Sequence, residues 1–299
     1  MSKLNVGLLG FTGTVGAATL GPLIKAHEES KLNLVILYRE SSDLSKLPSD
    51  IDLQKRVVYL DEQGTEKTRE AVKDLNVIIS TVNGEGIYRQ LFLLDALKGS
   101  DNLKTLIVSD FGANWTKEEQ KNKALSPINT KLDVVKKANE LGVPVTSVRV
   151  GILDLFFYAY KFLGTDVNNN KIETFNDSLN QPLRITSLEY VGNAVTQLIQ
   201  TPEKIANKYI GLYDIEVTGQ QVIDVLTKLH GKPTEVTEYT RERYEEDLKT
   251  LPSAIGAEIR KRWGNGKWDN EDNKQVDNLK VDTPGYKLKS FEELTKQYL

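Results

Sequence analysis

Three glycines near the start of the chain have the spacing of a loop that binds phosphate groups. Gly10, Gly13 and Gly16 follow the apolar run Leu4–Leu9 and precede a segment with helical spacing. In such a loop the first glycine permits a tight turn, the second lets the backbone approach a pyrophosphate, and the third lets the helix pack closely on the strand. Unpaired N–H groups at the helix start then hold the anion.

This pattern predicts a dinucleotide site; the simpler alternative is a purely structural turn. The expected contacts are the residues of the glycine loop, namely Gly10, Phe11, Thr12, Gly13, Thr14, Val15 and Gly16.

The residues after the second apolar run, Leu32–Tyr38, indicate which dinucleotide this loop holds. They read Arg39, Glu40, Ser41 and Ser42. An acidic side chain at this place binds the ribose hydroxyls of NAD, whereas an arginine accommodates the 2′-phosphate of NADP. Arg39 can pair with that phosphate through two parallel hydrogen bonds, and the serines can add hydroxyl contacts. We therefore expect NADP(H), with Arg39 and Ser41 in contact; Glu40 argues for NAD(H) unless it points to solvent, and Arg39 could be an ordinary exposed side chain.

Composition excludes several other kinds of chemistry. The 299 residues include no cysteine, which removes disulfides, thiolate metal sites and a cysteine nucleophile. The two histidines, His27 and His230, are too few for a histidine-rich metal centre and lie near no nucleophile motif, so we expect no metal and no Ser–His–Asp hydrolase. No phosphate-binding motif of the G-x-x-x-x-G-K-[ST] type is present.

Charge and hydropathy restrict the partners in the same way. The net charge of -3 argues against nucleic acid or an anionic membrane, since both need a positive field. No apolar run approaches the ~18 to 20 residues of a membrane helix, and the N-terminus has no secretory pattern. We expect a cytoplasmic protein that acts on a small molecule.

The candidate residues belong to an alternation of apolar runs and helical segments. After the first two runs, further strands are expected at 56–60, 76–82, 104–109 and 143–150, and helices at 67–73, 87–97 and 129–141, the last ending at Gly142. This rhythm predicts a Rossmann-type, doubly wound parallel α/β sheet over residues 1–150. Residues 151–299 are expected mostly to complete a smaller substrate pocket, with some segments returning to the first domain.

Local patterns in this second half are less uniform. The aromatic-rich stretch 153–164 fits either a helix that lines a cleft or plain core, and the polar stretch 167–178 fits a hairpin or loop. Helices are expected to begin after Ser187 and at Thr218. The highly charged stretch 241–280 is expected to form solvated helices and loops.

Several motifs occur together in one order. GFTGTVG is followed by Arg39-Glu-Ser, then by STV at 80–82, then by SDFG at 109–112, and Lys131 stands eleven residues before the GVPVT segment. Over about residues 1–200 this ensemble resembles the NmrA-like, isoflavone-reductase-like branch of the atypical short-chain dehydrogenases/reductases, in which Glu usually stands where this chain has Asp110. The resemblance implies cofactor contacts at Thr81, Val82 and Lys131. It further implies that Lys131 is the catalytic acid or base near the nicotinamide, whereas spacing alone also fits a solvated lysine.

The chain also departs from this family at two places. Plant reductases often carry an arginine one turn after the lysine, where this chain has Val135, and an Asn-Cys-Phe where it has 151–153. The phenylpropanoid substrates of the plant enzymes are therefore not carried over. The Tyr-x-x-x-Lys pair of the typical short-chain dehydrogenases is absent.

Together these features favour an NADPH-dependent reductase of a small carbonyl or activated alkene compound. The cofactor supplies the hydride chemistry and the protein supplies orientation and electrostatics. The alternative is an NADP(H)-binding redox sensor or regulatory protein without turnover, with a protein partner; a methyltransferase is disfavoured because Arg39 stands where an acid would hold the adenosyl ribose. The substrate, stereochemistry and oligomeric state are not fixed by the sequence. The residues expected to shape the substrate pocket are Asn83, Asn114, Leu153, Phe156 and Phe157.

Overall fold

The predicted alternation of strands and helices forms an eight-stranded parallel sheet. A computed structural model of the chain describes residues 3–268, 276–278 and 281–299. The strand order is β13-β10-β6-β5-β4-β1-β2-β3, and each neighbouring pair is parallel. The Rossmann-type fold predicted from the sequence is confirmed. The strands are β1 (Leu4–Leu9), β2 (Leu32–Tyr38), β3 (Gln54–Val57), β4 (Val77–Ser80), β5 (Thr105–Gly112), β6 (Val145–Val150), β10 (Tyr209–Leu212) and β13 (Val276–Asn278).

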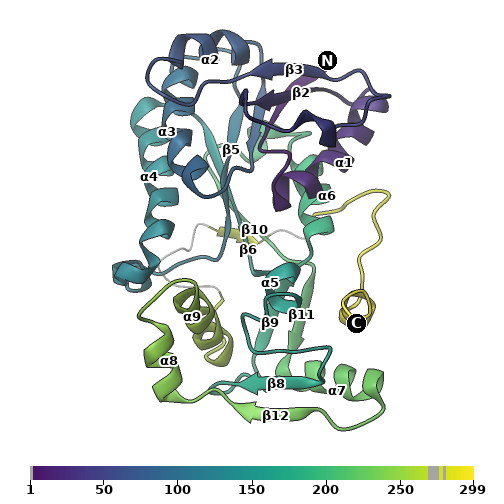
Figure 1. Cartoon of the computed structure of the whole chain (residues 1–299). Helices are drawn as coiled ribbons and strands as arrows, with labels where there is room; N and C mark the ends of the chain where they lie inside the picture. The colour runs from purple at the N-terminus through teal and green to yellow at the C-terminus, as the bar shows by residue number, and fades with distance from the viewer. Residues whose placement is uncertain (1–2, 269–275, 279–280) are drawn as a thin grey trace.

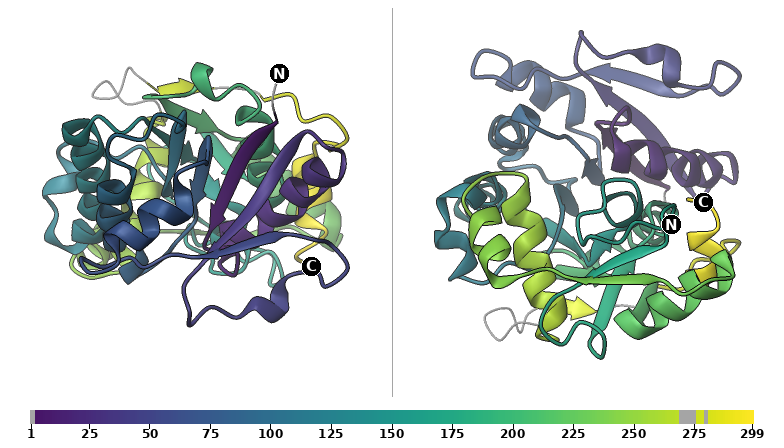
Figure 2. Two further views of the ribbon diagram at one scale, coloured as in Figure 1. Left: turned by 90° about the horizontal axis from the view of Figure 1, so that it is seen from above. Right: turned by 60° about the horizontal axis from the view of Figure 1, so that its bottom comes forward.

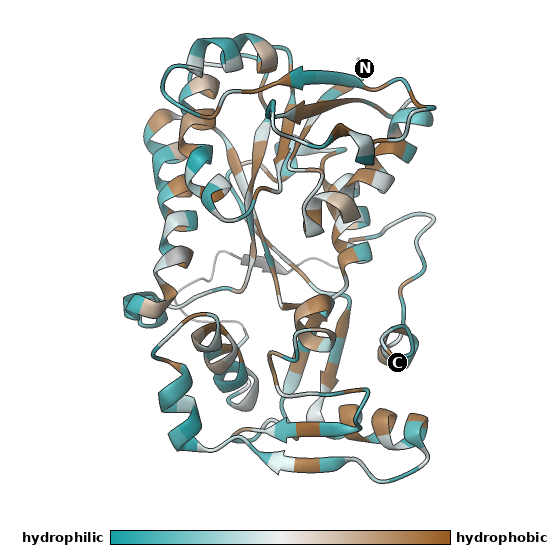
Figure 3. Cartoon of the chain, viewed as in Figure 1, coloured by the Kyte–Doolittle hydropathy of each residue, from teal (hydrophilic) through white to brown (hydrophobic). Residues whose placement is uncertain are grey.

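Helices cover both faces of this sheet (Figure 1). Helices α1 (Thr14–Glu28) and α6 (Leu188–Leu198) lie on one face; α2 (Thr65–Val72), α3 (Glu85–Leu97) and α4 (Ser126–Leu141) lie on the other. Successive side chains of a strand point to opposite faces of the sheet. Ile36 of β2 packs in the core under α1 and α6, whereas its neighbours Val35 and Leu37 pack in the core on the other face. Hydropathy follows this layering, since the sheet is largely apolar and the outer helix faces are polar (Figure 3).

The rest of the chain forms a smaller part at the carboxyl-terminal edge of the sheet (Figures 1 and 2). It has its own core, in which Phe157, Leu226 and Trp263 are buried. Its sheets are β11-β9-β7 and β12-β8. Its strands are β7 (Ile152–Leu153), β8 (Lys171–Thr174), β9 (Pro182–Thr186), β11 (Ile215–Thr218) and β12 (Glu235–Glu238), and its helices are α5 (Asp154–Tyr158), α7 (Gly219–His230), α8 (Arg241–Asp247), α9 (Ser253–Gly264) and α10 (Phe291–Thr295).

Helix α6 and strands β10 and β13, although late in the chain, belong to the central sheet and its helical layers. The chain therefore crosses between the two parts more than once. Short 3-10 helices complete the list of elements, namely η1 (Leu44–Lys46), η2 (Glu119–Lys121), η3 (Lys123–Leu125) and η4 (Pro202–Lys204).

The predicted helix ends are confirmed at three places. Ser187 Oγ accepts a hydrogen bond from Tyr190 N, and Thr218 forms a full capping box with Gln221. Gly142 ends α4 with a φ of 68°. The start of α4 differs from the prediction: the helix begins at Ser126, so Lys131 lies in its second turn rather than opening it.

The charged stretch 241–280 differs from the expectation of solvated helices. In α9, Glu258, Arg260 and Arg262 are buried, because their charges are paired inside the fold. Residues 269–275 and 279–280 of this stretch lie outside the described residues. The polar stretch 167–178 is only partly a local turn, since β8 pairs in parallel with β12 more than sixty residues later.

Candidate functional site

The glycine loop joins β1 to α1 in the form expected for an anion site. Gly13 N donates to Gly10 O at 3.0 Å, and Gly13 is the N-cap of α1 with no side-chain cap bond and no acidic residue in the first turn. The first-turn amides therefore keep their donors for a ligand. A Cβ at position 16 would overlap the Gly10 carbonyl oxygen, so this tight loop requires Gly16.

The loop packs against the end of β4, where Thr81 Oγ1 donates to Leu9 O at 2.9 Å. Phe11 does not present its side chain to this site. The residue is 2% exposed and its ring lies in the core under α1 and α6, so the side chain is not available for a cofactor contact. The sequence pattern predicted the loop but not the direction in which the Phe11 side chain points.

A cavity of about 530 Å³ opens beside the loop, at the carboxyl ends of β1, β4 and β5. Ligands of open α/β sheets bind at this edge. One wall is aromatic: the ring centroids of Phe156 and Phe162 are 5.0 Å apart, and those of Phe156 and Tyr160 are 5.4 Å apart. The lining residues are Thr14, Val15, Thr81, Val82, Asn83, Ile87, Ser109, Asp110, Phe111, Lys131, Leu153, Leu155, Phe156, Tyr160, Phe162 and Pro252.

Eight of the seventeen predicted site residues line this cavity, and two of the five predicted substrate contacts do not. Phe157 is fully buried in the core of the smaller part, where it packs against Phe291, because it faces away from its neighbour Phe156 on the short helix α5. The prediction for Phe157 is therefore wrong. Asn114 does not line the cavity either. The predicted residues that do line it are Thr14, Val15, Thr81, Val82, Asn83, Lys131, Leu153 and Phe156.

Arg39 and Ser41 lie on an exposed loop at the carboxyl end of β2, the strand beside β1. Glu40 is exposed, and its Oε1 accepts a hydrogen bond from the Tyr59 hydroxyl at 3.1 Å. Within the described part of the chain, the Arg39 guanidinium has no hydrogen-bond or ion-pair partner. The acid that would favour NAD is thus engaged by Tyr59, while the arginine beside it remains available to an anion.

Lys131 brings a cation to the wall of the cavity. Its Nζ donates to the main-chain oxygen of Asp110 and lies 3.9 Å from Asp110 Oδ1. The side chain is 23% exposed. Burial lowers the pKa of Lys131; the Asp110 carboxylate opposes this shift and Arg149 adds to it. A lysine in this setting gives up its proton more readily than one in water.

Behind Lys131 lies a buried cluster that the sequence analysis did not single out as functional. Asp110 Oδ2 accepts a hydrogen bond from Ser147 Oγ at 2.5 Å and forms an ion pair with Arg149 Nη2 at 2.9 Å. Asp110 and Arg149 are both almost fully buried. The sequence offered one signal, the position of Asp110 in SDFG, but Arg149 comes from the neighbouring strand β6 and could be linked to it only through the fold.

Comparison with known proteins agrees with this geometry. The model of the NmrA-like family matches residues 2–282. The chain belongs to the NmrA-like family. Among its relatives, the oxidoreductase aprR of Aspergillus flavus is 29% identical over 234 residues, covering 76% of this chain and 74% of its own. The bifunctional pinoresinol-lariciresinol reductase of Forsythia intermedia is 26% identical over 281 residues, covering 85% of each chain.

Solved structures show the same fold as this NmrA-like chain. A crystal structure of isoflavone reductase superposes with a TM-score of 0.79 at 18% identity over the whole of both chains. The leucoanthocyanidin reductase–NADPH complex from Vitis vinifera gives a TM-score of 0.77 at 18% identity, covering 98% of this chain and 99% of that one. At this identity the likeness establishes the fold alone.

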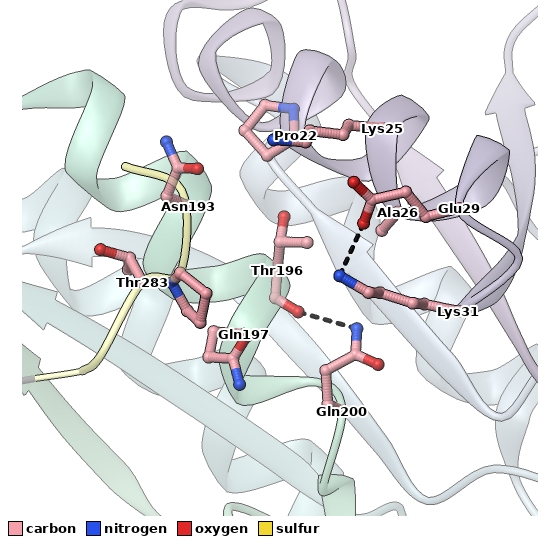
Figure 4. Close-up of a pocket in the computed structure, with 11 residues that line it drawn as sticks. Pro22, Lys25, Ala26, Glu29, Lys31, Asn193, Thr196, Gln197, Gln200 and Thr283 are labelled. Carbon is pink, nitrogen blue, oxygen red and sulfur yellow. Dashed lines mark hydrogen bonds and ion pairs between the residues drawn. The ribbon is translucent and has the colours of Figure 1, made fainter. Parts of the chain in front are cut away.

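A second hollow of about 440 Å³ lies between α1 and α6 (Figure 4). It is at the opposite edge of the sheet, since Lys31 in its wall directly precedes the first residue of β2. Two of its polar side chains already have partners: Lys31 pairs with Glu29 at 2.6 Å, and Gln200 Nε2 donates to Thr196 O at 3.1 Å. This hollow is therefore separate from the cavity beside the glycine loop.

The described residues contain no group of three or more His, Cys, Asp or Glu side chains able to hold a metal ion. None of their helices combines the length and hydropathy needed to cross a membrane.

Proposed function

We propose that this NmrA-like chain is an NADP(H)-dependent reductase of a small carbonyl or activated alkene compound. The observation that carries the proposal is the position of Lys131, whose ammonium lines the cavity that begins at the glycine loop. A proton donor and a dinucleotide loop on one cavity are the two parts that a reductase of this kind needs.

The chain's own residues fit NADP(H). The uncapped first turn of α1 offers amide donors to a pyrophosphate, and Gly16 keeps the loop tight against β4. Arg39, unpartnered within the described residues, offers two parallel donors to a 2′-phosphate. The NADPH complex of the Vitis vinifera enzyme supports the same choice. Bound NADPH would supply the hydride.

Lys131 then supplies the proton. A carbonyl or enone oxygen gains negative charge as it is reduced, and an ammonium at the wall can stabilise that charge and donate a proton from Nζ. The lowered pKa of Lys131 makes this donation easier near neutral pH. The aromatic wall of Phe156, Tyr160 and Phe162 restricts water there and favours a substrate with an apolar ring or chain beside its reducible group.

The test is NADPH consumption against a panel of aldehydes, ketones, enones and quinones, with the Kd of NADPH and NADH measured by fluorescence titration. The proposal expects tighter binding of NADPH than of NADH and turnover of at least one class. Tight NADPH binding with no turnover would favour the sensor alternative. Failure to bind either dinucleotide would overturn both.

A further inference from the structure

Strand β5 is irregular where it reaches the cavity. Its pairing with β6 shifts register between Val108 and Gly112, and Phe111 has a φ of 41°, a conformation that non-glycine residues rarely adopt. Such bulges re-aim side chains beside active sites. Here the irregular segment contains Asp110, whose main-chain oxygen accepts from Lys131 Nζ.

Gly112 lies directly beside the ammonium of Lys131. A Cβ at Gly112 would lie 3.4 Å from Lys131 Nζ and 3.5 Å from Asp110 Oδ1. Both are ordinary contact distances, so the Gly112 backbone, the ammonium and the carboxylate are neighbours at this place. Gly112 also pairs with Arg149 in the shifted register, which brings the guanidinium alongside.

The Asp110–Arg149 pair is incomplete. Asp110 Oδ2 accepts a hydrogen bond from Ser147 Oγ and pairs with the Arg149 guanidinium, but the other oxygen, Oδ1, has no hydrogen-bond partner among the described residues. Arg149 Nε is likewise buried without a partner, while its Nη1 donates to Ala113 O at 3.1 Å. Buried polar atoms normally find partners, and exceptions call for an explanation. The cation closest to Asp110 Oδ1 on the cavity side is Lys131, at 3.9 Å.

We propose that Asp110 and Arg149 are the positioning residues of Lys131: Asp110 holds the ammonium at the cavity wall with its carbonyl and its free carboxylate oxygen, and Arg149 limits how tightly it is held. This inference rests on the role given to Lys131 above and adds two residues that do not themselves react.

The charges around Lys131 explain why two opposed groups are needed. The charged groups that act on its Nζ are Asp110 from β5 and Arg149 from β6. Tyr160 is the remaining titratable side chain among the cavity-lining residues, and the other lining side chains are uncharged. Without Asp110, burial and Arg149 together favour the neutral amine, which has no proton to donate. Without Arg149, the carboxylate holds the ammonium more tightly and slows proton release.

The test measures the protonation of Lys131 directly and needs neither cofactor nor turnover. Trace labelling with acetic anhydride from pH 7 to 11, followed by peptide mass spectrometry, gives the midpoint at which each amine becomes reactive. Asp110→Asn should move the midpoint of Lys131 to lower pH by about one unit. Arg149→Gln should move it to higher pH. The exposed Lys136 on the same helix is the internal control and should not shift.

Midpoint shifts of opposite sign in the two variants distinguish a positioning role of Asp110 and Arg149 from a purely structural one. Lys131 midpoints that stay within about 0.2 units of the native value in both folded variants would overturn the proposal, as would shifts of the same sign. If one of the single variants does not fold, the other still tests the proposal. The double variant, Asp110→Asn with Arg149→Gln, leaves neither charge unpaired in the interior and should give an intermediate Lys131 midpoint. Because the labelling is done without substrate, shifts of opposite sign with no turnover would support this inference while failing the proposed function.

Discussion

Two buried arginine–carboxylate pairs join distant segments of this chain, and they are completed to different degrees. At the junction with α9, Arg262 Nε donates to Glu119 Oε1 at 3.1 Å and Arg262 Nη2 donates to Glu119 Oε2, which also accepts from Thr116 N at 2.7 Å. Both carboxylate oxygens are satisfied. At the cavity, the Asp110–Arg149 pair leaves one oxygen and one nitrogen without a hydrogen-bond partner among the described residues.

The difference indicates different roles. A satisfied buried pair fixes geometry, and its loss leaves an uncompensated charge in the interior. An incomplete pair still has polar atoms that can interact with a group that moves or changes its charge, and Lys131 is adjacent to this pair. We therefore expect changes at the α9 junction to act on stability and changes around the cavity to act on binding and proton transfer.

The largest effect on stability should follow from removing the Glu119–Arg262 pair at the α9 junction. Glu119→Ala removes both acceptors of Arg262 and should lower the free energy of unfolding by about 3 to 5 kcal/mol, measured by urea denaturation. Glu118→Ala is the matched control, because Glu118 is exposed and pairs with Lys121 at the surface; its unfolding curve should overlay the native one. Equal curves for the two variants would remove the distinction drawn between the pairs.

A change in the glycine loop should reduce cofactor binding and leave the folded state intact. In the free protein a Cβ at Gly13 meets its neighbours at an ordinary 3.5 Å, so Gly13→Val should fold, with an unchanged circular dichroism spectrum. The added methyl groups stand where a pyrophosphate must approach, so binding of both NADPH and NADH should fall at least ~100-fold. Gly21→Val, at an open position of α1, is the control. Normal NADPH binding by a folded Gly13→Val protein would make the loop only a turn.

A smaller and more selective effect is expected at Arg39. Arg39→Ala should cost ~1.5 to 3 kcal/mol of NADPH binding and little of NADH binding, because only NADPH carries the 2′-phosphate. Lys46→Ala removes an exposed cation from the same connecting segment and should leave both Kd values nearly unchanged. An equal loss for both cofactors in fluorescence titrations would show that Arg39 does not read the phosphate.

Much of this account could be predicted from the sequence because it depends on local signals. The glycine loop and the Ser187 and Thr218 caps follow from residue type and spacing, whereas the role of Lys131 was implied by the family resemblance. The choice between Phe156 and Phe157 could not, since on a five-residue helix either neighbour could face the cavity.

The buried charges of α9 were predicted to be solvated because their partners are distant in sequence. Glu119 and Glu173 lie more than eighty residues from Arg262 and Arg260. The Asp110–Arg149 pair was missed for the same reason, since it depends on the shifted register between β5 and β6. Pairing of this kind becomes visible only when the strands and helices are assembled.

The most direct test of the central claim is the kcat of Lys131→Ala on the panel substrate that the native protein reduces fastest, measured beside Lys136→Ala. We predict a loss of ~10² to 10⁴ in kcat for Lys131→Ala, with an unchanged fold and little rescue by Lys131→Arg, and native kcat for Lys136→Ala. A native kcat in Lys131→Ala, or a loss confined to NADPH affinity, would contradict the assignment of Lys131 as the proton donor.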